Sequence, residues 1–357
     1  MARRQGSMYE TIEFIQNWIK TNQHCHSLRE DIRPGSTPKE VVYQEDKLVL
    51  YRFTPQVEKP FPVPLLMVYA LVNRPYIVDL QEGRSLVANL LKLGIDVYLI
   101  DWGYPSRGDR WITLDDYING YLNTCVDVIR HRHQLDSINL LGICQGGTFS
   151  LCYSALYPDK VKTLITMVTP VDFHVQDGLL NTWVGPSSGS QALDVDRLVE
   201  AFGNIPGSIL NATFLMLKPF QLGVQKYIDL LESWDNKDKL LTFLYMEKWI
   251  FDSPAQSGET FRQFVKDFYR GNKLIQGTVE IGDRSVDLGK IHMPVLNIYA
   301  EQDHLVPPAA SLALEHYISS QDYTVCSFPV GHIGIYVSSK VQNNLPPRIA
   351  DWLKARA

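Results

Sequence analysis

One short stretch of the chain combines a nucleophile with the glycines that a tight turn needs. Cys144 lies in the sequence Gly142-Ile143-Cys144-Gln145-Gly146, with a glycine two residues before it and another two residues after it. An apolar run ends just before this stretch and a helical pattern begins just after it, which is the context of a nucleophile elbow with Cys in place of Ser. Side chains at the flanking positions would collide with the strand and the helix. The spacing therefore predicts that Cys144 is a catalytic nucleophile and not a packed core cysteine.

Two further residues follow later apolar runs, in the chain order that an elbow of this type requires. Asp303 comes after the run 294–300, and His332 comes after the run 323–328. Both are expected at the same edge of a parallel sheet as Cys144, in the order nucleophile, acid, histidine. His332 is expected to help form the thiolate. Asp303 either orients His332 or acts as a base toward a hydroxyl, and the sequence leaves both roles open.

Two backbone N–H groups are candidates for an oxyanion hole. Gln145 begins the helix behind the nucleophile, and Val72 follows the buried run 65–70. N–H groups at a helix N-terminus favour a developing negative charge. By the usual geometry of the elbow, we expect the backbone N–H groups of Gln145 and Val72 to be the donors.

Alternating strand and helix patterns surround these residues. Apolar runs predict buried strands at 65–70, 96–100, 137–141, 163–168, 294–300 and 323–328, and weak alternation predicts another at 47–51. Helical patterns cover 85–93, 113–132 and 145–155, with Gly94 as a stop signal and Thr113 with Asp116 as a capping box. Together with the elbow, this alternation predicts an α/β-hydrolase fold: a mostly parallel sheet with helices on both faces.

The alternation stops near residue 169. From 177 to 282 the pattern is mostly helical, and nine aromatic residues fall within positions 230–270, about twice the chain average of 11%. We expect this piece to be a cap inserted into one α/β core formed by 38–176 and 283–357, with 1–37 as an N-terminal arm. A closed apolar cap would keep water from a covalent intermediate. Trp249 and Phe251 are interpreted as part of the cap's own core.

Composition excludes several classes of function. The 357 residues carry 34 Lys and Arg against 39 Asp and Glu, a net charge of −5, which argues against nucleic acid as a partner. No apolar run is long enough for a transmembrane segment, and the start lacks the apolar part of a signal peptide. Five cysteines without close pairs predict reduced thiols in a cytoplasmic protein. No metal or redox cofactor is implied.

The remaining cysteines and one further histidine receive structural interpretations. Cys125, Cys152 and Cys326 lie in apolar surroundings and are expected in the core. His304 follows Asp303 directly, but its chain position is wrong for the catalytic histidine. We therefore expect His304 to be packed for structural reasons.

Seven short motifs, spread from about residue 38 to the end of the chain, resemble those of one enzyme family. They are Val68-Tyr69-Ala70-Leu71-Val72-Asn73-Arg74-Pro75-Tyr76, Asp101-Trp102-Gly103-Tyr104-Pro105, the elbow Gly142 to Gly147, Thr169-Pro170-Val171-Asp172-Phe173, Gly203-Asn204-Ile205-Pro206-Gly207, Gln302-Asp303-His304-Leu305-Val306-Pro307 and Gly331-His332-Ile333-Gly334-Ile335-Tyr336. With them the chain resembles the catalytic C subunit of a class III poly(3-hydroxyalkanoate) synthase.

This resemblance implies a reaction and its partners. The enzyme would polymerise (R)-3-hydroxyacyl-CoA, with 3-hydroxybutyryl-CoA as the expected substrate, and would release coenzyme A as a product. Cys144 would carry the growing polyester chain, His332 would activate it, and Asp303 would help to deprotonate the incoming hydroxyl. The resemblance also implies an E subunit as partner, self-association, and residence at the surface of cytoplasmic polyhydroxyalkanoate granules.

A cysteine suits this chemistry independently of the resemblance. Coenzyme A esters are thioesters, so transfer to another thiol keeps the acyl group activated for attack by a hydroxyl. Two alternatives stay open: a thiol-dependent hydrolase or depolymerase of the same fold, and a non-catalytic granule-coat protein. Arg74 has two equally plausible roles, contact with a phosphate of coenzyme A or a structural salt bridge.

Overall fold

One eight-stranded sheet forms the centre of the computed structural model, which describes residues 32–175, 178, 180, 193–216 and 236–357. Its strand order is β1-β2-β6-β3-β7-β8-β11-β12. The strands are β1 Lys39–Glu45, β2 Leu48–Phe53, β3 Leu65–Val68, β6 Val97–Asp101, β7 Ile138–Ile143, β8 Val161–Met167, β11 Val295–Ala300 and β12 Tyr323–Phe328. β1 and β2 pair in antiparallel fashion at one edge, and from β6 onward all pairs are parallel. The predicted mostly parallel sheet is confirmed.

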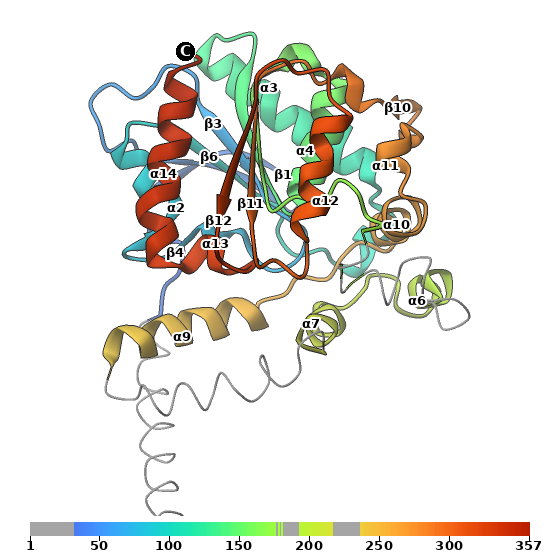
Figure 1. Ribbon diagram of the computed structural model, residues 1–357. Helices are drawn as coiled ribbons and strands as arrows, with labels where there is room; N and C mark the ends of the chain where they lie inside the picture. The colour runs from blue at the N-terminus through green and yellow to red at the C-terminus, as the bar shows by residue number, and fades with distance from the viewer. Residues whose placement is uncertain (1–31, 176–177, 179, 181–192, 217–235) are drawn as a thin grey trace, which may run out of the picture.

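Helices cover both faces of this sheet (Figure 1). Helices α2 (Leu86–Lys92) and α14 (Ser339–Lys354) lie on one face, and α3 (Asn123–His133) and α4 (Gln145–Leu156) lie on the other. Within β3, Leu65 and Met67 belong to the buried cluster on the α2 and α14 side, whereas Leu66 and Val68 belong to the cluster on the α4 side. Successive side chains of a strand point to opposite faces. A strand buried on both faces is therefore apolar throughout, as the sequence pattern indicated.

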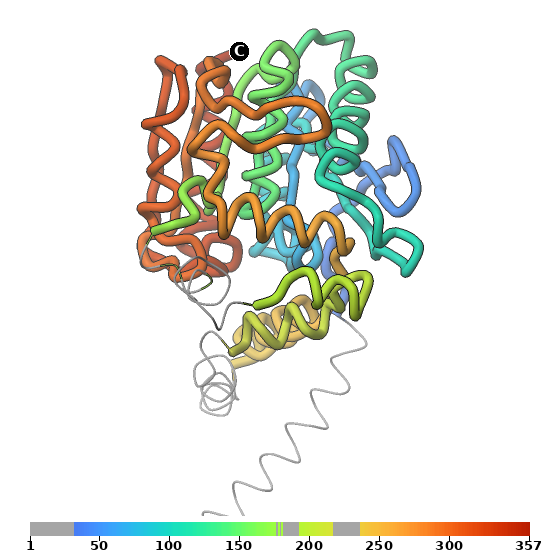
Figure 2. Tube along the Cα trace, turned by 90° about the vertical axis from the view of Figure 1, so that its right-hand side faces the viewer, coloured from blue at the N-terminus to red at the C-terminus, as the bar shows by residue number. Residues whose placement is uncertain are grey.

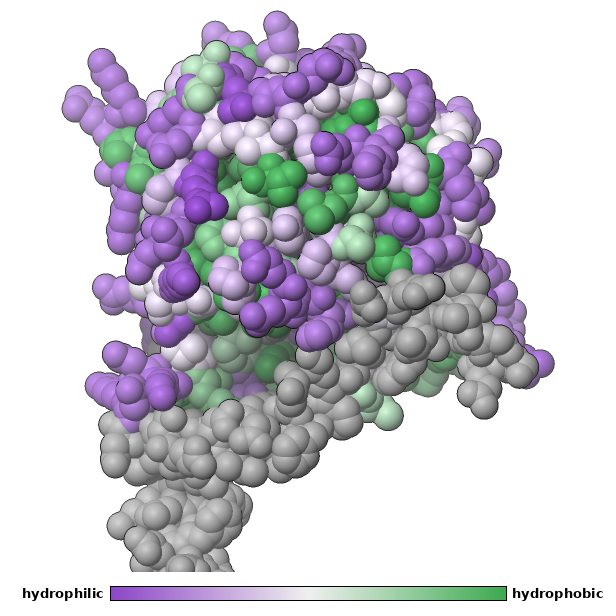
Figure 3. Space-filling model, viewed as in Figure 1, coloured by the Kyte–Doolittle hydropathy of each residue, from purple (hydrophilic) through white to green (hydrophobic). Residues whose placement is uncertain are grey.

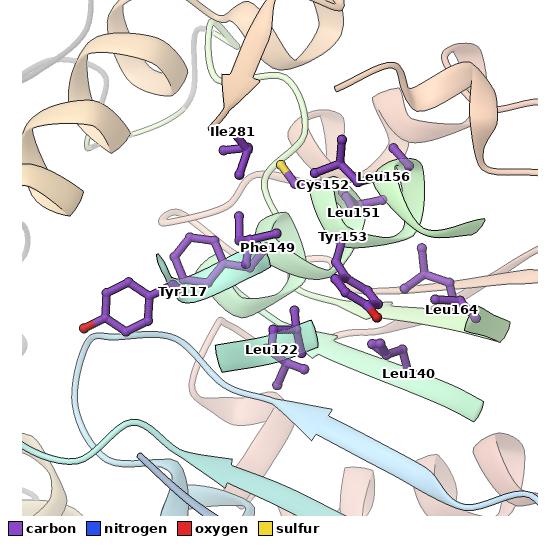
Figure 4. Packing of buried hydrophobic residues seen from close by; sticks show 14 of the residues in the cluster. Tyr117, Leu122, Leu140, Phe149, Leu151, Cys152, Tyr153, Leu156, Leu164 and Ile281 are labelled. Carbon is purple, nitrogen blue, oxygen red and sulfur yellow. The ribbon is translucent and has the colours of Figure 1, made fainter. Parts of the chain in front are cut away.

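Helix α4 is buried along its whole length. Figure 4 shows Phe149, Cys152 and Tyr153 of this helix among apolar side chains from several elements, including Leu140 of β7 and Ile281. The helix behind the nucleophile is thus fixed by packing on all sides. The three cysteines predicted to be core residues are buried, as expected: Cys125, Cys152 and Cys326.

The predicted capping box at the start of one helix and the glycine stop signal at the end of another are both present in the structure. The Thr113 hydroxyl accepts a hydrogen bond from the Asp116 N–H at 3.3 Å, and Asp116 Oδ2 accepts one from the Thr113 N–H at 2.7 Å. This capping box opens a helix that first runs as a π-helix, Asp116–Leu122, before it continues as α3. Gly94 has a φ of 85° just after α2, in the left-handed region that favours glycine at a helix end.

The segment assigned above to a cap contains two kinds of structure in its described parts. Helices α6 (Val195–Phe202), α7 (Gly207–Met216) and α9 (Lys237–Phe251) lie beneath the carboxyl ends of the strands (Figures 1 and 2). After them, α10 (Gly258–Gln263), a π-helix (Phe264–Arg270), α11 (Lys273–Gln276) and the hairpin β9 (Val279–Ile281) and β10 (Arg284–Val286) return to the main body. Phe264, Phe268 and Ile281 join the same buried cluster as α4. The boundaries 177 and 282 stay a prediction.

The two aromatic residues assigned to the cap's core have different surroundings. Trp249 is buried, but Phe251 is 60% exposed, so the prediction for Phe251 is wrong. Phe251 is the last residue of α9, whose buried side is formed by Leu240, Leu244 and Trp249. Neighbouring positions on a helix do not share a face.

Short elements complete the described chain. They are a 3₁₀ helix Pro75–Val78, the strand pair β4 (Asp79–Gln81) and β5 (Arg84–Ser85), α12 (Pro308–Leu312) and α13 (Gly334–Val337). In the view of Figure 3 the surface is mostly hydrophilic, with hydrophobic residues scattered between. More than half of the side chain is exposed at Phe202, Met216 and Phe251, one from each of α6, α7 and α9. Over the residues that the structure describes, no helix has the length and apolar character needed to cross a membrane.

Candidate active site

The chain turns sharply at Cys144, between β7 and α4. Cys144 has φ 54° and ψ −124°, a conformation that residues other than glycine rarely adopt. Its N–H donates to the carbonyl oxygen of Met167 at 2.9 Å, which ties the turn to the end of β8. Strained backbone of this kind persists only where the surrounding structure fixes it, and it clusters at functional sites.

The glycines around Cys144 fit closely against neighbouring elements. A Cβ at Gly142 would overlap the side chain of Ser150, and a Cβ at Gly146 would overlap the carbonyl oxygen of Val68 and the backbone of Tyr69. These contacts are far too close for any side chain. The turn therefore sits directly on the end of β3, which brings the start of α4 beside the loop that follows β3.

Asp303 and His332 meet at the ends of β11 and β12. Nδ1 of His332 lies 2.7 Å from Oδ2 of Asp303. The other carboxylate oxygen, Oδ1, accepts hydrogen bonds from the N–H groups of Leu305 and Val306, each at 2.9 Å. The Asp303 side chain is fully buried and the His332 side chain is 10% exposed. Both carboxylate oxygens are thus engaged, and the imidazole is held in one orientation.

Backbone hydrogen bonds join the two loops that carry these residues. The Glu301 N–H donates to the Phe328 carbonyl at 2.9 Å, and the Gln302 N–H donates to the Val330 carbonyl at 3.0 Å. His304 is exposed, so its predicted packing is wrong. The preceding residue, Asp303, is the buried one.

The imidazole of His332 also interacts with the sulfur of Cys144. Burial lowers the pKa of His332, but the charges of Asp303 and Cys144 and a side-chain hydrogen bond to each raise this pKa to about 10. Because Nδ1 faces Asp303, Nε2 is the nitrogen left for the sulfur. A protonated imidazole beside a cysteine favours the thiolate. The three residues selected from chain order are therefore brought together, in an arrangement suited to nucleophilic attack.

The two expected oxyanion donors come from adjacent segments. Gln145 is the first residue of α4, where N–H groups have no partner within the helix. Its side-chain Oε1 accepts a hydrogen bond from the N–H of Leu71 at 3.1 Å. The next N–H along this loop is that of Val72, and in the described parts of the chain no group accepts a hydrogen bond from it. Among the described residues neither N–H group has an acceptor, so both stay candidates for binding an oxyanion.

Asn73, which sequence reasoning did not single out, connects this loop to α9. Its Nδ2 lies 3.2 Å from the carbonyl oxygen of Trp249, 3.1 Å from that of Ile250 and 2.8 Å from Oγ of Ser253. Asn73 has a φ of 57°, in the left-handed region where asparagine is tolerated better than most residues. The C-terminal end of α9 thereby holds the loop that contains Val72. An asparagine within the quoted motif was the only signal for this contact.

Arg74 forms the structural salt bridge, one of its two suggested roles. Its Nη2 lies 2.6 Å from Oδ2 of Asp101, and both side chains are largely buried. The guanidinium also lies over the ring of Tyr104, 4.2 Å from its centroid. The Tyr104 hydroxyl donates to Asp252, just beyond α9, at 2.6 Å. The positive charge of Arg74 is therefore already paired inside the protein.

Tyr336 of α13 is a further residue of the site that sequence reasoning missed. Its side chain is 2% exposed. The ring packs edge to face against His332, with centroids 6.3 Å apart, and against Tyr69, with centroids 6.5 Å apart. Its hydroxyl is buried and has no hydrogen-bond partner among the described residues.

Two family models match the chain. Residues 63–338 match the alpha/beta hydrolase fold, and residues 17–90 match the model described as the N-terminus of poly-beta-hydroxybutyrate polymerase (PhaC). The second match begins well before residue 38, where the resemblance was expected to start. That expectation is corrected: the family pattern reaches into the N-terminal arm.

Relatives similar over nearly the whole chain carry one description, poly(3-hydroxyalkanoate) polymerase subunit PhaC. The protein from Synechocystis is 64% identical over 99% of this chain and 94% of its own length. The protein from Allochromatium vinosum is 59% identical over 97% of both chains. The protein from the archaeon Haloferax mediterranei is 43% identical over all of this chain and 71% of its own length.

Solved structures support the fold. A monoacylglycerol lipase from Paleococcus ferrophilus superposes with a TM-score of 0.55 at 15% identity, covering 87% of this chain and all of that one. A putative lipase from Sulfolobus solfataricus superposes with the same TM-score of 0.55 at 14% identity, covering 89% of this chain and 99% of that one. The predicted α/β-hydrolase fold is confirmed.

Proposed function

The chain belongs to the PhaC family of poly(3-hydroxyalkanoate) polymerase subunits and is an acyltransferase, and we propose that it polymerises (R)-3-hydroxyacyl-CoA through a thioester on Cys144. The expected substrate is 3-hydroxybutyryl-CoA, and coenzyme A leaves as a product. The observation that carries this proposal is the arrangement of Cys144 and His332, with Asp303 on the far side of the imidazole.

The first step loads the acyl group onto the enzyme. The Cys144 thiolate attacks the thioester carbonyl, and the negative charge on the carbonyl oxygen is bound by the N–H groups of Val72 and Gln145. The bond from carbon to the sulfur of coenzyme A then breaks. The departing thiolate takes the proton of the His332 imidazolium, which leaves a neutral histidine beside the new thioester.

The second step forms the polymer bond and restores the site. A 3-hydroxyl group attacks the Cys144 thioester, and neutral His332 accepts its proton. The carbon–sulfur bond breaks, the Cys144 thiolate leaves, and the thiolate–imidazolium pair is regenerated. Because both oxygens of Asp303 are already hydrogen-bonded, we assign to Asp303 the orienting role and not that of a direct base.

The surroundings of the site suit a polymerase. Helices α6, α7 and α9 lie over the carboxyl edge and expose large apolar side chains. We propose that this cap limits access of water to the acyl-enzyme and meets polymer or protein partners. The relatives are named as subunits, and we propose an E subunit and self-association for this chain, with residence at cytoplasmic granule surfaces.

Incubation with (R)-3-hydroxybutyryl-CoA, with and without an E subunit, tests the proposal. Release of coenzyme A together with insoluble polymer is expected, and Cys144→Ala should abolish both. Release of free 3-hydroxybutyrate without polymer would instead favour a hydrolase. Normal polymer accumulation by Cys144→Ala in cells without another synthase would favour a granule-coat protein.

A further inference from the structure

The hydroxyl of Tyr336 has no hydrogen-bond partner among the described residues, unlike the hydroxyls of two other buried tyrosines. Tyr98 is fully buried, and its hydroxyl lies 2.7 Å from Nε2 of His133. Tyr153 is also fully buried, and its hydroxyl donates to Asn123 at 3.1 Å. Tyr336 is buried just as deeply, but its hydroxyl has no partner among the described residues.

An unpartnered buried hydroxyl destabilises a fold, because the group has lost its hydrogen bonds to water and gained none. Phenylalanine would fill the same space without this penalty. Packing alone therefore does not explain a tyrosine at position 336. Buried polar groups without partners are expected where a ligand supplies the missing hydrogen bond.

The position of Tyr336 identifies the ligand that is within reach. Its ring packs edge to face against both His332 and Tyr69, and Tyr69 begins the loop that leads to Val72. Burial, together with the nearby Tyr69, Cys144 and Asp303, raises the pKa of Tyr336 well above its usual value. The phenol is thus neutral at physiological pH and keeps a proton to donate.

We propose that the Tyr336 hydroxyl donates a hydrogen bond to the 3-oxygen of the acyl unit held on Cys144. This assignment rests on the proposed function. The carbonyl oxygen of that unit is directed to the N–H groups of Val72 and Gln145. The 3-oxygen is then the remaining polar atom of a 3-hydroxyacyl group close to the sulfur.

A donor suits this oxygen throughout chain growth. In the first acyl unit the 3-oxygen is a hydroxyl, which can donate or accept a hydrogen bond. After elongation it is an ester oxygen, which can only accept. A neutral phenol can donate to both, so Tyr336 would recognise the unit on Cys144 at every stage.

Tyr336→Phe tests the proposal, since it removes one oxygen atom and keeps the ring. We expect kcat/KM for (R)-3-hydroxybutyryl-CoA to fall about tenfold, the usual scale for one lost hydrogen bond. The inhibition constant of butyryl-CoA, which lacks the 3-oxygen, should not change. The melting temperature should stay the same or rise, because an unsatisfied group has been removed.

Tyr98→Phe is the matched control. It removes a hydroxyl that has a partner, far from the site in the fold, and should lower the melting temperature while leaving kcat/KM unchanged. Equal activity of Tyr336→Phe and the unmodified protein would overturn the proposal, as would a lower melting temperature that accounts for the loss. If the unmodified protein releases no coenzyme A from the hydroxylated substrate, the proposed function itself fails.

Discussion

Oε1 of Gln145 accepts a hydrogen bond from the backbone N–H of Leu71, 3.1 Å away. The residue that follows the nucleophile therefore holds, with its side chain, the loop that carries the second proposed oxyanion donor. The backbone N–H of the same residue is the first proposed donor. The contact with Leu71 and those of Asn73 together hold the loop that carries the second proposed donor.

Replacing Gln145 by alanine should reduce both catalysis and stability. The buried N–H of Leu71 would lose its acceptor, at a cost of about 1–3 kcal/mol in the free energy of unfolding. Displacement of the neighbouring Val72 N–H should lower kcat by about tenfold to a hundredfold. Urea unfolding and steady-state kinetics would measure both effects. Gln81→Ala, which removes a hydrogen bond to Thr242 outside the site, is the control and should leave kcat unchanged. An unaltered kcat in Gln145→Ala would show that the contact is not needed.

Asn73→Gly should uncouple the loop from α9. Glycine keeps the left-handed backbone conformation but removes the three contacts to the end of α9. We expect kcat to fall about tenfold, since the donor loop becomes mobile, with little change in KM. Asn344→Ala serves as the comparison, because it breaks an exposed 2.7 Å hydrogen bond to the carbonyl oxygen of Lys340 within α14. A change in KM alone would place Asn73 in substrate binding instead.

The stability contributed by His332 should depend on pH with a defined sign. Its pKa in the folded protein is raised from the ordinary 6.5 to about 10, so the folded state binds the proton more tightly than the unfolded state. The resulting stabilisation is fully present below pH 6.5 and is lost as the pH rises toward 10. Melting temperatures of the unmodified protein and of His332→Gln should therefore converge between pH 6.5 and 10. A difference that stays constant or grows over this range would contradict the raised pKa of His332.

Arg74→Met should act through stability. Removing one member of a largely buried ion pair leaves Asp101 uncompensated, and about 3 kcal/mol of stability should be lost. The KM for acyl-CoA should change little, because the guanidinium is already paired within the protein. Calorimetry and kinetics on the same variant distinguish the two roles. A several-fold higher KM at an unchanged melting temperature would support contact with a phosphate of coenzyme A.

The positions of the three site residues at strand ends could be predicted, because the carboxyl ends of parallel strands all lie at one edge of the sheet. Continuous apolar runs identified the central strands, and the order in which Cys144, Asp303 and His332 follow them fixed one edge of the sheet. The role of Asp303 could not be chosen, since it depends on where the second carboxylate oxygen points. Asn73 and Tyr336 lie in motifs that the sequence had marked. Their functions depend on what other elements place opposite them, which no local pattern records.

Short elements were missed for a related reason. Strands β9 and β10 have three residues each, too few to show a period of two. The pair Gly282-Asp283 between them is a two-residue hairpin signal that was available in the sequence. β1 was not predicted, because most of its residues are exposed and several are charged, as suits an edge strand, so its sequence shows no buried face.

The close seating of Gly146 on the end of β3 leaves the turn with no room to travel. In the proposed mechanism Cys144 therefore stays in place, while the product of the reaction lengthens by one unit in every cycle. During chain growth the polyester must then move relative to the sulfur of Cys144, and not the sulfur relative to the polyester.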